Sequence, residues 1–242
     1  MCTLSWWIND SGRGVFFNRD ELHTRSHGLP PRCVTGPSGQ QILMPLDPDA
    51  GGTWIGVNDA GLIVAVLNNY PHYQKVLPSQ RSRGQLVVDL LDQANDAVSC
   101  MALADGVDAQ IYRGFLLFAL DRQHEPLARA WDGVSLVDLS LGGVGGLHSL
   151  TTSSVRHEDC RDFRHALLGA ERRERDVLNE KHSYYHYEDS SLGPVMVRED
   201  ASTDSITEIS LSADQARVRF QTVREKPAVI GLAQVSQLQL KC

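Results

Sequence analysis

Two short stretches near the N-terminus decide the fold of this chain, Met1-Cys2-Thr3-Leu4-Ser5-Trp6-Trp7 and Asn18-Arg19-Asp20-Glu21. The first predicts a buried strand over residues 2–8, because apolar side chains occupy both of its faces. Residues 14–19 are predicted to be its hairpin partner, joined through a polar, glycine-containing turn at residues 10–14. Such a hairpin would place the charged tetrapeptide beside Cys2.

Cys2 directly follows the initiator methionine. If Met1 is removed, Cys2 carries a thiol and a free α-amine, which titrates near pH ~8 where a lysine titrates near ~10.4. The sequence alone also fits a buried strand cysteine, and Arg19-Asp20 also fits an ordinary ion pair at a strand end. Asn68 and Asn69 end a later predicted strand, and their amides could donate hydrogen bonds to an oxyanion.

Composition excludes several classes of function. The 242 residues carry a net charge of -7, which disfavours a nucleic-acid partner. The five cysteines are odd in number and form no Cys-x-x-Cys pair, so we expect a reducing compartment and no metal site. No signal peptide or integral membrane segment is expected, since the longest apolar run covers only residues 115–120. A cytoplasmic location is therefore predicted, and the oligomeric state is unspecified.

The remaining pattern predicts an α+β fold in one domain over residues 1–242, because antiparallel hairpins dominate both ends and helices lie between them. Residues 24–50 are rich in proline and glycine and predict a long irregular segment beside the cleft. Helices are predicted at 84–95, where Ser82 serves as the cap, at 158–168 and, after a break, at 171–181. The other predicted strands cover residues 53–57, 62–67, 111–119, 128–131, 135–139, 147–152, 205–211 and 216–223.

Several separated motifs resemble the NRDE family, whose eukaryotic relatives are called transport and Golgi organisation protein 2. They are Met1-Cys2-Thr3, Asn18-Arg19-Asp20-Glu21, Pro45-Leu46-Asp47, Gly51-Gly52-Thr53-Trp54-Ile55-Gly56, Asn58-x-x-Gly61-Leu62 and Ser82-Arg83-Gly84, in that order. The same features more distantly resemble the N-terminal-nucleophile cysteine hydrolases, which include penicillin V acylases and conjugated bile acid hydrolases. This second resemblance implies a four-layer αββα sandwich with antiparallel sheets and hydrolysis of linear amides.

The resemblance also implies a set of site residues. It puts the nucleophile at Cys2, its charged neighbours at Arg19 and Asp20, and an oxyanion donor at Asn68. Thr152 takes the place of the hydrolases' second amide-bearing asparagine. Arg19 and Asp20 are adjacent here, whereas two residues separate them in the hydrolases, so Asp20 and Glu21 are alternatives for one role. The expected ligand-binding residues are Asn18, Glu21, Asn69, Arg83 and His148.

These groups suggest an amidohydrolase, with a carrier as the alternative. We expect Arg19 to lower the pKa of the Cys2 thiol and Asp20 to accept a hydrogen bond from the α-ammonium. The thiolate would then attack a linear amide or thioester, without a required cofactor. The alternative is a non-catalytic trafficking protein that holds haem or an acyl lipid in the same cleft. His182 and His186 are possible haem or metal ligands, but residues 182–193 are predicted to be an aromatic surface loop.

Overall fold

Two antiparallel sheets make up the centre of the molecule in the computed structural model, which describes residues 1–10, 12–70, 81–142, 146–169, 174–224 and 229–241. Sheet A has the order β10-β1-β2-β11-β12-β13, and β14 also pairs with β12. Its strands are β1 (Cys2–Asn9), β2 (Gly12–Leu22), β10 (Ser149–Thr152), β11 (Ala201–Leu211), β12 (Gln215–Arg224), β13 (Val229–Ile230) and β14 (Gln234–Gln239).

Sheet B runs in simple order from β3 to β9. Its strands are β3 (Leu29–Thr35), β4 (Gln41–Leu46), β5 (Ile55–Asn58), β6 (Ile63–Asn68), β7 (Phe115–Leu120), β8 (Leu127–Trp131) and β9 (Leu136–Asp138). Each strand therefore pairs with its neighbour in the chain, and the crossovers of this fold are confined to sheet A.

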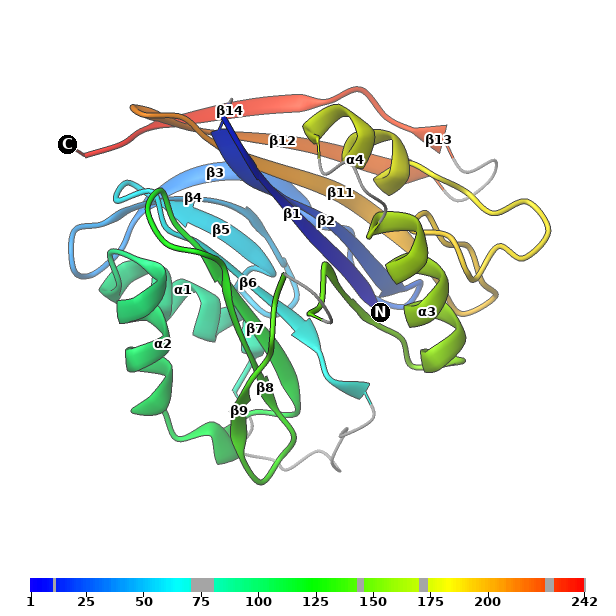
Figure 1. Ribbon diagram of the computed structural model, residues 1–242, viewed down its shortest axis with the longest axis horizontal. Helices are drawn as coiled ribbons and strands as arrows, with labels where there is room; N and C mark the ends of the chain where they lie inside the picture. The colour runs from blue at the N-terminus through cyan, green and yellow to red at the C-terminus, as the bar shows by residue number, and fades with distance from the viewer. Residues whose placement is uncertain (11, 71–80, 143–145, 170–173, 225–228, 242) are drawn as a thin grey trace.

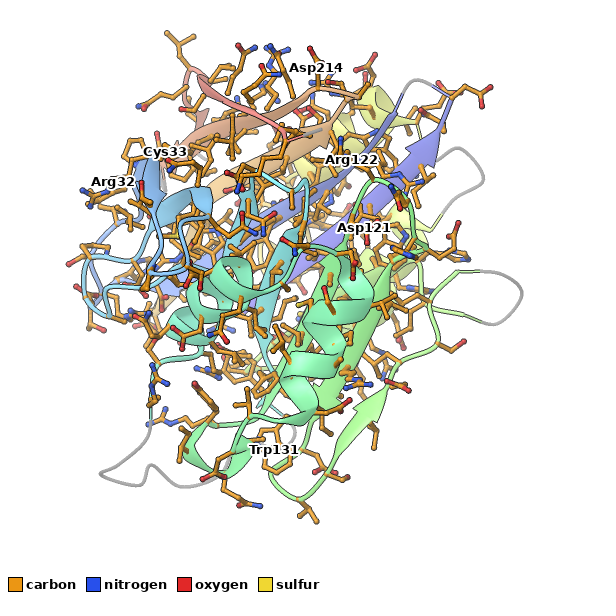
Figure 2. The ribbon with its side chains drawn as sticks, turned by 90° about the vertical axis from the view of Figure 1, so that its left-hand side faces the viewer. Arg32, Cys33, Asp121, Arg122, Trp131 and Asp214 are labelled. Atoms are coloured by element: carbon orange, nitrogen blue, oxygen red, sulfur yellow. The ribbon has the colours of Figure 1, made fainter. Side chains whose placement is uncertain are left out.

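Helices cover the outer faces of both sheets (Figure 1). Helices α1 (Arg83–Gln93) and α2 (Ala97–Asp105) pack on sheet B, and Figure 2 looks onto this helical face. Helices α3 (His157–Leu168) and α4 (Arg175–His182) pack on β10 and β2 of sheet A. The layers are thus helix, sheet, sheet, helix, and the predicted αββα sandwich is confirmed.

Strand β1 supplies side chains to two layers, because successive residues of a strand point to opposite faces. Leu4 and Trp6 belong to the apolar core between the sheets, as does Cys2 at the start of the strand. Trp7 faces the other way, against Leu168 of α3 and Leu178 of α4. The apolar character of both faces of this strand therefore reflects burial on both sides, as predicted.

The proline-rich segment contains regular structure that the sequence pattern did not predict. Strands β3 and β4 form a hairpin within residues 24–50, where an irregular segment is predicted. Strand β3 is an edge strand, largely exposed, and it carries Pro30 and Pro31. Exposed edge strands tolerate proline and lack the apolar alternation of buried strands, which explains the error.

Most other predicted elements are found with shifted ends. The predicted helix at 84–95 corresponds to α1, and the strand expected at 111–119 begins only at Phe115, after a short 3-10 turn. Helix α4 begins at Arg175, and the start of the helix predicted at 171–181 lies outside the described residues. Helix α2 and strands β13 and β14 were not predicted. For α2 a pattern was present, because Asp96 and Ser99 form a capping box.

Candidate active site

Cys2 lies between two strands that fix its neighbours. In the antiparallel register, Cys2 pairs with Arg19 of β2 on one side and with Thr152 of β10 on the other. Paired residues on one face have their Cβ atoms about 5 Å apart. The hairpin predicted from the first twenty-one residues therefore places Arg19 beside Cys2, and strand β10 places Thr152 on the other side of Cys2.

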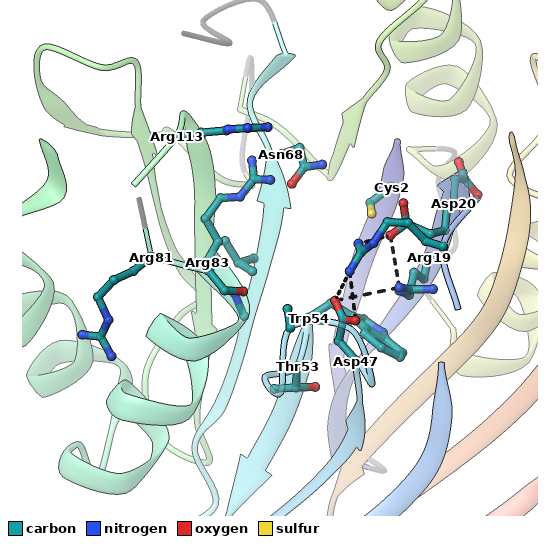
Figure 3. A pocket seen from close by; sticks show the side chains of 16 residues that line it. Cys2, Arg19, Asp20, Asp47, Thr53, Trp54, Asn68, Arg81, Arg83 and Arg113 are labelled. Carbon is teal, nitrogen blue, oxygen red and sulfur yellow. Dashed lines mark hydrogen bonds and ion pairs between the residues drawn. The ribbon is translucent and has the colours of Figure 1, made fainter. Parts of the chain in front are cut away.

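The tetrapeptide Asn18-Arg19-Asp20-Glu21 divides between the two faces of β2. Arg19 and Glu21 line a pocket of about 450 Å³ between the sheets, together with Cys2. The side chains of Asn18 and Asp20 point to the opposite face. There Asn18 bonds to His182 of α4, and Asp20 bonds to Arg164 of α3. Figure 3 shows the Asp20 carboxylate pointing away from Cys2. The period of two along a strand requires this division.

Asp20 has partners other than the one expected for it. Its carboxylate accepts hydrogen bonds from Arg164 Nη1 at 3.1 Å and from Thr203 Oγ1 at 2.6 Å, and the Asp20 and Arg164 side chains are both fully buried. The N-terminal ammonium of Met1 instead lies 3.5 Å from the Asp20 backbone oxygen. The Asp20 side chain thus faces the helical layer, and its carboxylate is bound by Arg164 and Thr203 and not by the Met1 ammonium.

Asn18 forms hydrogen bonds with a buried histidine and does not line the pocket. Its Nδ2 donates to the backbone oxygens of His182 and Pro194, each at 2.9 Å. His182 Nδ1 lies 2.6 Å from Asn18 Oδ1, and its Nε2 lies 2.7 Å from Ser5 Oγ. Burial lowers the pKa of His182 to about 3. His182 therefore ends α4 as a neutral, buried side chain, which corrects its assignment to a surface loop.

Arg19 is surrounded by acids. Its Nη1 donates to Asp204 Oδ2 at 2.8 Å, and its Nη2 lies 3.1 Å from Glu21 Oε2 without making a hydrogen bond. The guanidinium carbon also lies 4.6 Å from the centre of the Trp54 ring. A β-bulge between Thr203 and Ser205 interrupts the β11–β2 register beside Arg19, at the position of Asp204. Sequence reasoning missed Asp204, which is 185 residues from Arg19.

The Cys2 thiol is not activated by Arg19 in this arrangement. Burial is the largest influence and raises the pKa of the Cys2 thiol. The N-terminal ammonium acts in the opposite direction, and the charges of Asp20 and Glu21 raise the thiol pKa further. Arg19 is not among the main influences on this pKa, and the carboxylates of Asp204 and Glu21 lie against its guanidinium. The cation that favours the thiolate is the N-terminus itself.

Tyr70 connects the N-terminus to Asn68. Its hydroxyl oxygen accepts hydrogen bonds from the Met1 ammonium at 2.7 Å and from Asn68 Nδ2 at 2.9 Å. Burial raises the pKa of Tyr70 well above its usual range, so the phenol stays protonated. Sequence reasoning missed this residue, although it directly follows the two asparagines at the end of β6. The Met1 side chain is buried beside Cys160, Met196 and Ala201.

The opposite wall of the pocket is rich in arginine. Arg83, in the first turn of α1, and Arg113, just before β7, lie across the pocket from Cys2, with Asn68 beside them (Figure 3). Arg83 Nη1 donates to the Gly114 backbone oxygen at 3.1 Å. Arg83 and Asn68 therefore do line the pocket that contains Cys2, on its sheet B side.

Two expected ligand-binding residues lie elsewhere. Asn69 points away from Asn68, donates to the Trp131 backbone oxygen at 3.2 Å and lines a separate, smaller pocket. His148 stacks on His165 of α3, with 6.3 Å between the ring centres. Neither side chain lines the larger pocket. Among the described residues, no cluster of three or more histidine, cysteine or acidic side chains could hold a metal ion.

Comparison with known proteins agrees with this geometry. The family model for Transport and Golgi organisation 2 matches residues 14–182. The chain belongs to this family. The Transport and Golgi organization 2 homologs of Mus musculus and Homo sapiens are each 32% identical to it, over 107 and 108 residues. Each match covers 43% of this chain and 37% of the relative, so the chain matches well under half of these family members.

Solved structures share the fold of this family member. The C2A mutant of conjugated bile acid hydrolase from Clostridium perfringens aligns with a TM-score of 0.55 at 13% identity, covering 99% of this chain and 92% of that one. A Caenorhabditis elegans ortholog of N-acylethanolamine-hydrolyzing acid amidase aligns with a TM-score of 0.54 at 10% identity, covering 86% and 92%. At these identities the likeness establishes the fold alone. No helix in the described parts of the chain combines the length and apolar character needed to cross a membrane.

Proposed function

We propose that this protein is an N-terminal cysteine hydrolase that cleaves a linear amide or thioester through Cys2 once Met1 is removed. The observation that carries the proposal is the position of Cys2. It begins β1, lines the pocket between the sheets and faces the amide of Asn68 across that pocket. The hydrolase-like fold supports the same reaction class, since similar folds include an amidase and a bile acid hydrolase.

Removal of Met1 is the activating step in this mechanism. With Met1 present, burial keeps the thiol protonated and the ammonium is bound to Tyr70. After removal, the amine belongs to Cys2 itself and lies closer to the sulfur, which favours the thiolate more strongly. An α-amine titrates near pH ~8, so it can also exchange protons near neutrality.

The chemical steps use Cys2 and Asn68, which line the pocket, and Thr152, which lies opposite Cys2 in the β1–β10 pair. The thiolate attacks the substrate carbonyl carbon, and the oxyanion receives hydrogen bonds from Asn68 Nδ2, which turns away from Tyr70, and from the Thr152 hydroxyl. The C–N or C–S bond then breaks, and the α-ammonium gives its proton to the leaving group. Water then attacks the acyl-cysteine and gives one proton to the amine, so the carboxylic acid is released and the thiolate and α-ammonium are restored.

The test is a comparison of two cysteine variants after the N-terminus has been defined by intact mass. Protein whose mass shows loss of Met1 is assayed against short acyl amides and thioesters. We expect hydrolysis by the wild type and by Cys33→Ser, because Cys33 is exposed on β3, and none by Cys2→Ala. Hydrolysis by Cys2→Ala, or complete retention of Met1 in active protein, would refute the mechanism.

A carrier in the same cleft is the second candidate. It is favoured by the state with Met1 in place, in which the thiol is protonated and the pocket volume still suits a small molecule. Haem fits this pocket poorly, because its described lining includes no histidine and Cys2 is the one thiol. An acyl ligand is the better form of this alternative. Saturable binding of an acyl ligand by Cys2→Ala, without turnover by the wild type, would favour the carrier.

A further inference from the structure

A second, smaller pocket lies on the other side of Thr152. Its volume is about 210 Å³, and it is lined by residues of β10, α3 and β7 together with Asn69, Leu139 and Leu147. Its apolar wall consists of four leucines, Leu116, Leu139, Leu147 and Leu150. Half of the residues that line the Cys2 pocket, by contrast, are charged. The two pockets therefore suit different parts of one amphiphilic molecule.

Thr152 lines this pocket with a hydroxyl group that makes no hydrogen bond. Its side chain is 1% exposed, and its Oγ1 has no hydrogen-bond partner. Buried hydroxyls in proteins are nearly always hydrogen-bonded, so an isolated one indicates a missing acceptor or donor. A carbonyl or carboxylate oxygen at this point would complete the hydrogen bonding of Thr152.

The position of Thr152 relates the second pocket to Cys2. The two residues are directly opposite each other in the β1–β10 pair, so their Cβ atoms are about 5 Å apart. Cys2 lines the first pocket and Thr152 lines the second, so an acyl group on the Cys2 sulfur can reach the second pocket by passing Thr152. From there its tail can continue between Leu150 and Leu116 into the leucine-lined pocket.

We propose that this pocket binds the acyl group of the substrate and limits it to a compact tail of about eight carbons. The proposal rests on the hydrolase function above and specifies its substrate class. A cavity of about 150 Å³ holds benzene, with six carbons, so a pocket of about 210 Å³ holds about eight. The preferred substrates are amides or thioesters of medium-chain acids, whose polar leaving group lies in the arginine-rich pocket.

The test measures binding without catalysis. Saturated fatty acid anions of four to twelve carbons are titrated calorimetrically into Cys2→Ala protein. We expect the affinity to rise at least 10-fold from butanoate to octanoate and then to level off, because the pocket is full. A continuing rise up to twelve carbons would indicate an open apolar surface and would overturn the proposal, as would no binding of octanoate.

Variants of the pocket sharpen the result. Leu147→Trp in the Cys2→Ala background should weaken octanoate binding at least 10-fold, whereas Leu232→Trp should not, because Leu232 is 97% exposed and does not line this pocket. Leu147→Ala should move the levelling point to longer chains, and it guards against misfolding of the tryptophan variant. Unchanged chain-length dependence in both Leu147 variants would overturn the proposal.

Failure of the pocket and failure of the hydrolase are distinguishable. If octanoate binds with this length dependence but the wild type never acylates Cys2, the pocket is a ligand site and the hydrolase mechanism fails. If the wild type hydrolyses acyl amides but shows no change of preference in the Leu147 variants, the hydrolase stands and the assigned acyl pocket is wrong.

Discussion

The two faces of strand β2 use charge in different ways. On the face toward the pocket, Arg19 shares acids with Arg25 in a network that opens to solvent. On the face toward the helices, Asp20 and Arg164 form a single ion pair with no exposed side-chain surface. Alternate residues of one tetrapeptide thus serve two purposes: one face builds the pocket, and the other attaches α3 to sheet A. A motif of this kind combines functional and structural residues.

The largest expected effect is on the helix-facing side. Asp20→Ala leaves the buried Arg164 guanidinium without its carboxylate, which should cost about 3–5 kcal/mol of unfolding free energy. Glu21→Ala, the matched change on the pocket face, should cost no more than about 1 kcal/mol because its ion pairs are partly exposed. Urea unfolding of both variants measures the difference. Equal losses would remove the distinction between the two faces.

The next effect concerns the pocket. Asn68→Ala should lower kcat/KM about 10²–10³-fold, the usual loss for an oxyanion donor, while the unfolding free energy changes by less than about 1 kcal/mol. The small stability change follows because Asn68 is partly exposed and its bond is to the Tyr70 hydroxyl. Steady-state kinetics on the purified variant provides the measurement. A variant with full activity would exclude Asn68 from the reaction.

A pH effect of intermediate size is expected from His182. Its folded pKa of about 3 lies below the unfolded value near 6.5, so the unfolded chain binds the extra proton between these values. Folding stability should therefore fall as the pH drops from about 6.5 toward 3, by up to about 1.4 kcal/mol per pH unit from this residue. Denaturation of the wild type and of His182→Gln across this range measures it; identical slopes would contradict the assignment.

The smallest effect concerns Glu21. Its negative charge raises the Cys2 thiol pKa, so Glu21→Gln should lower that pKa and speed alkylation of Cys2 a few-fold at pH 7. Iodoacetamide labelling, followed by peptide mass spectrometry, measures the rate at Cys2 with Cys33 as an internal reference. A slower reaction at Cys2 would show that Glu21 supports the thiolate through its partners.

The sandwich and the pairing of Cys2 with Arg19 could be predicted from the sequence, since both follow from the hairpin and the family resemblance. The division of the tetrapeptide could also have been predicted, because period-two alternation places Asn18 and Asp20 opposite Arg19. Other partners gave no local sign. Arg164 and Asp204 are each more than 140 positions along the chain from their partners Asp20 and Arg19, and only the folded structure brings them to β2. Strand β3 was missed because an exposed edge strand has no buried face to impose a pattern.

The central claim is that a free N-terminal Cys2 is the nucleophile, and acylation of a matched pair of chains tests it most directly. One chain begins at Cys2 by intact mass, and the other keeps an N-terminal extension ahead of Cys2. Both are treated with an activated octanoyl ester, quenched in acid and mapped by peptide mass. We predict one acyl group on Cys2, formed at least 10²-fold faster in the chain with the free N-terminus. Equal rates in the two chains, or no acyl-Cys2 in the processed chain, would contradict the account.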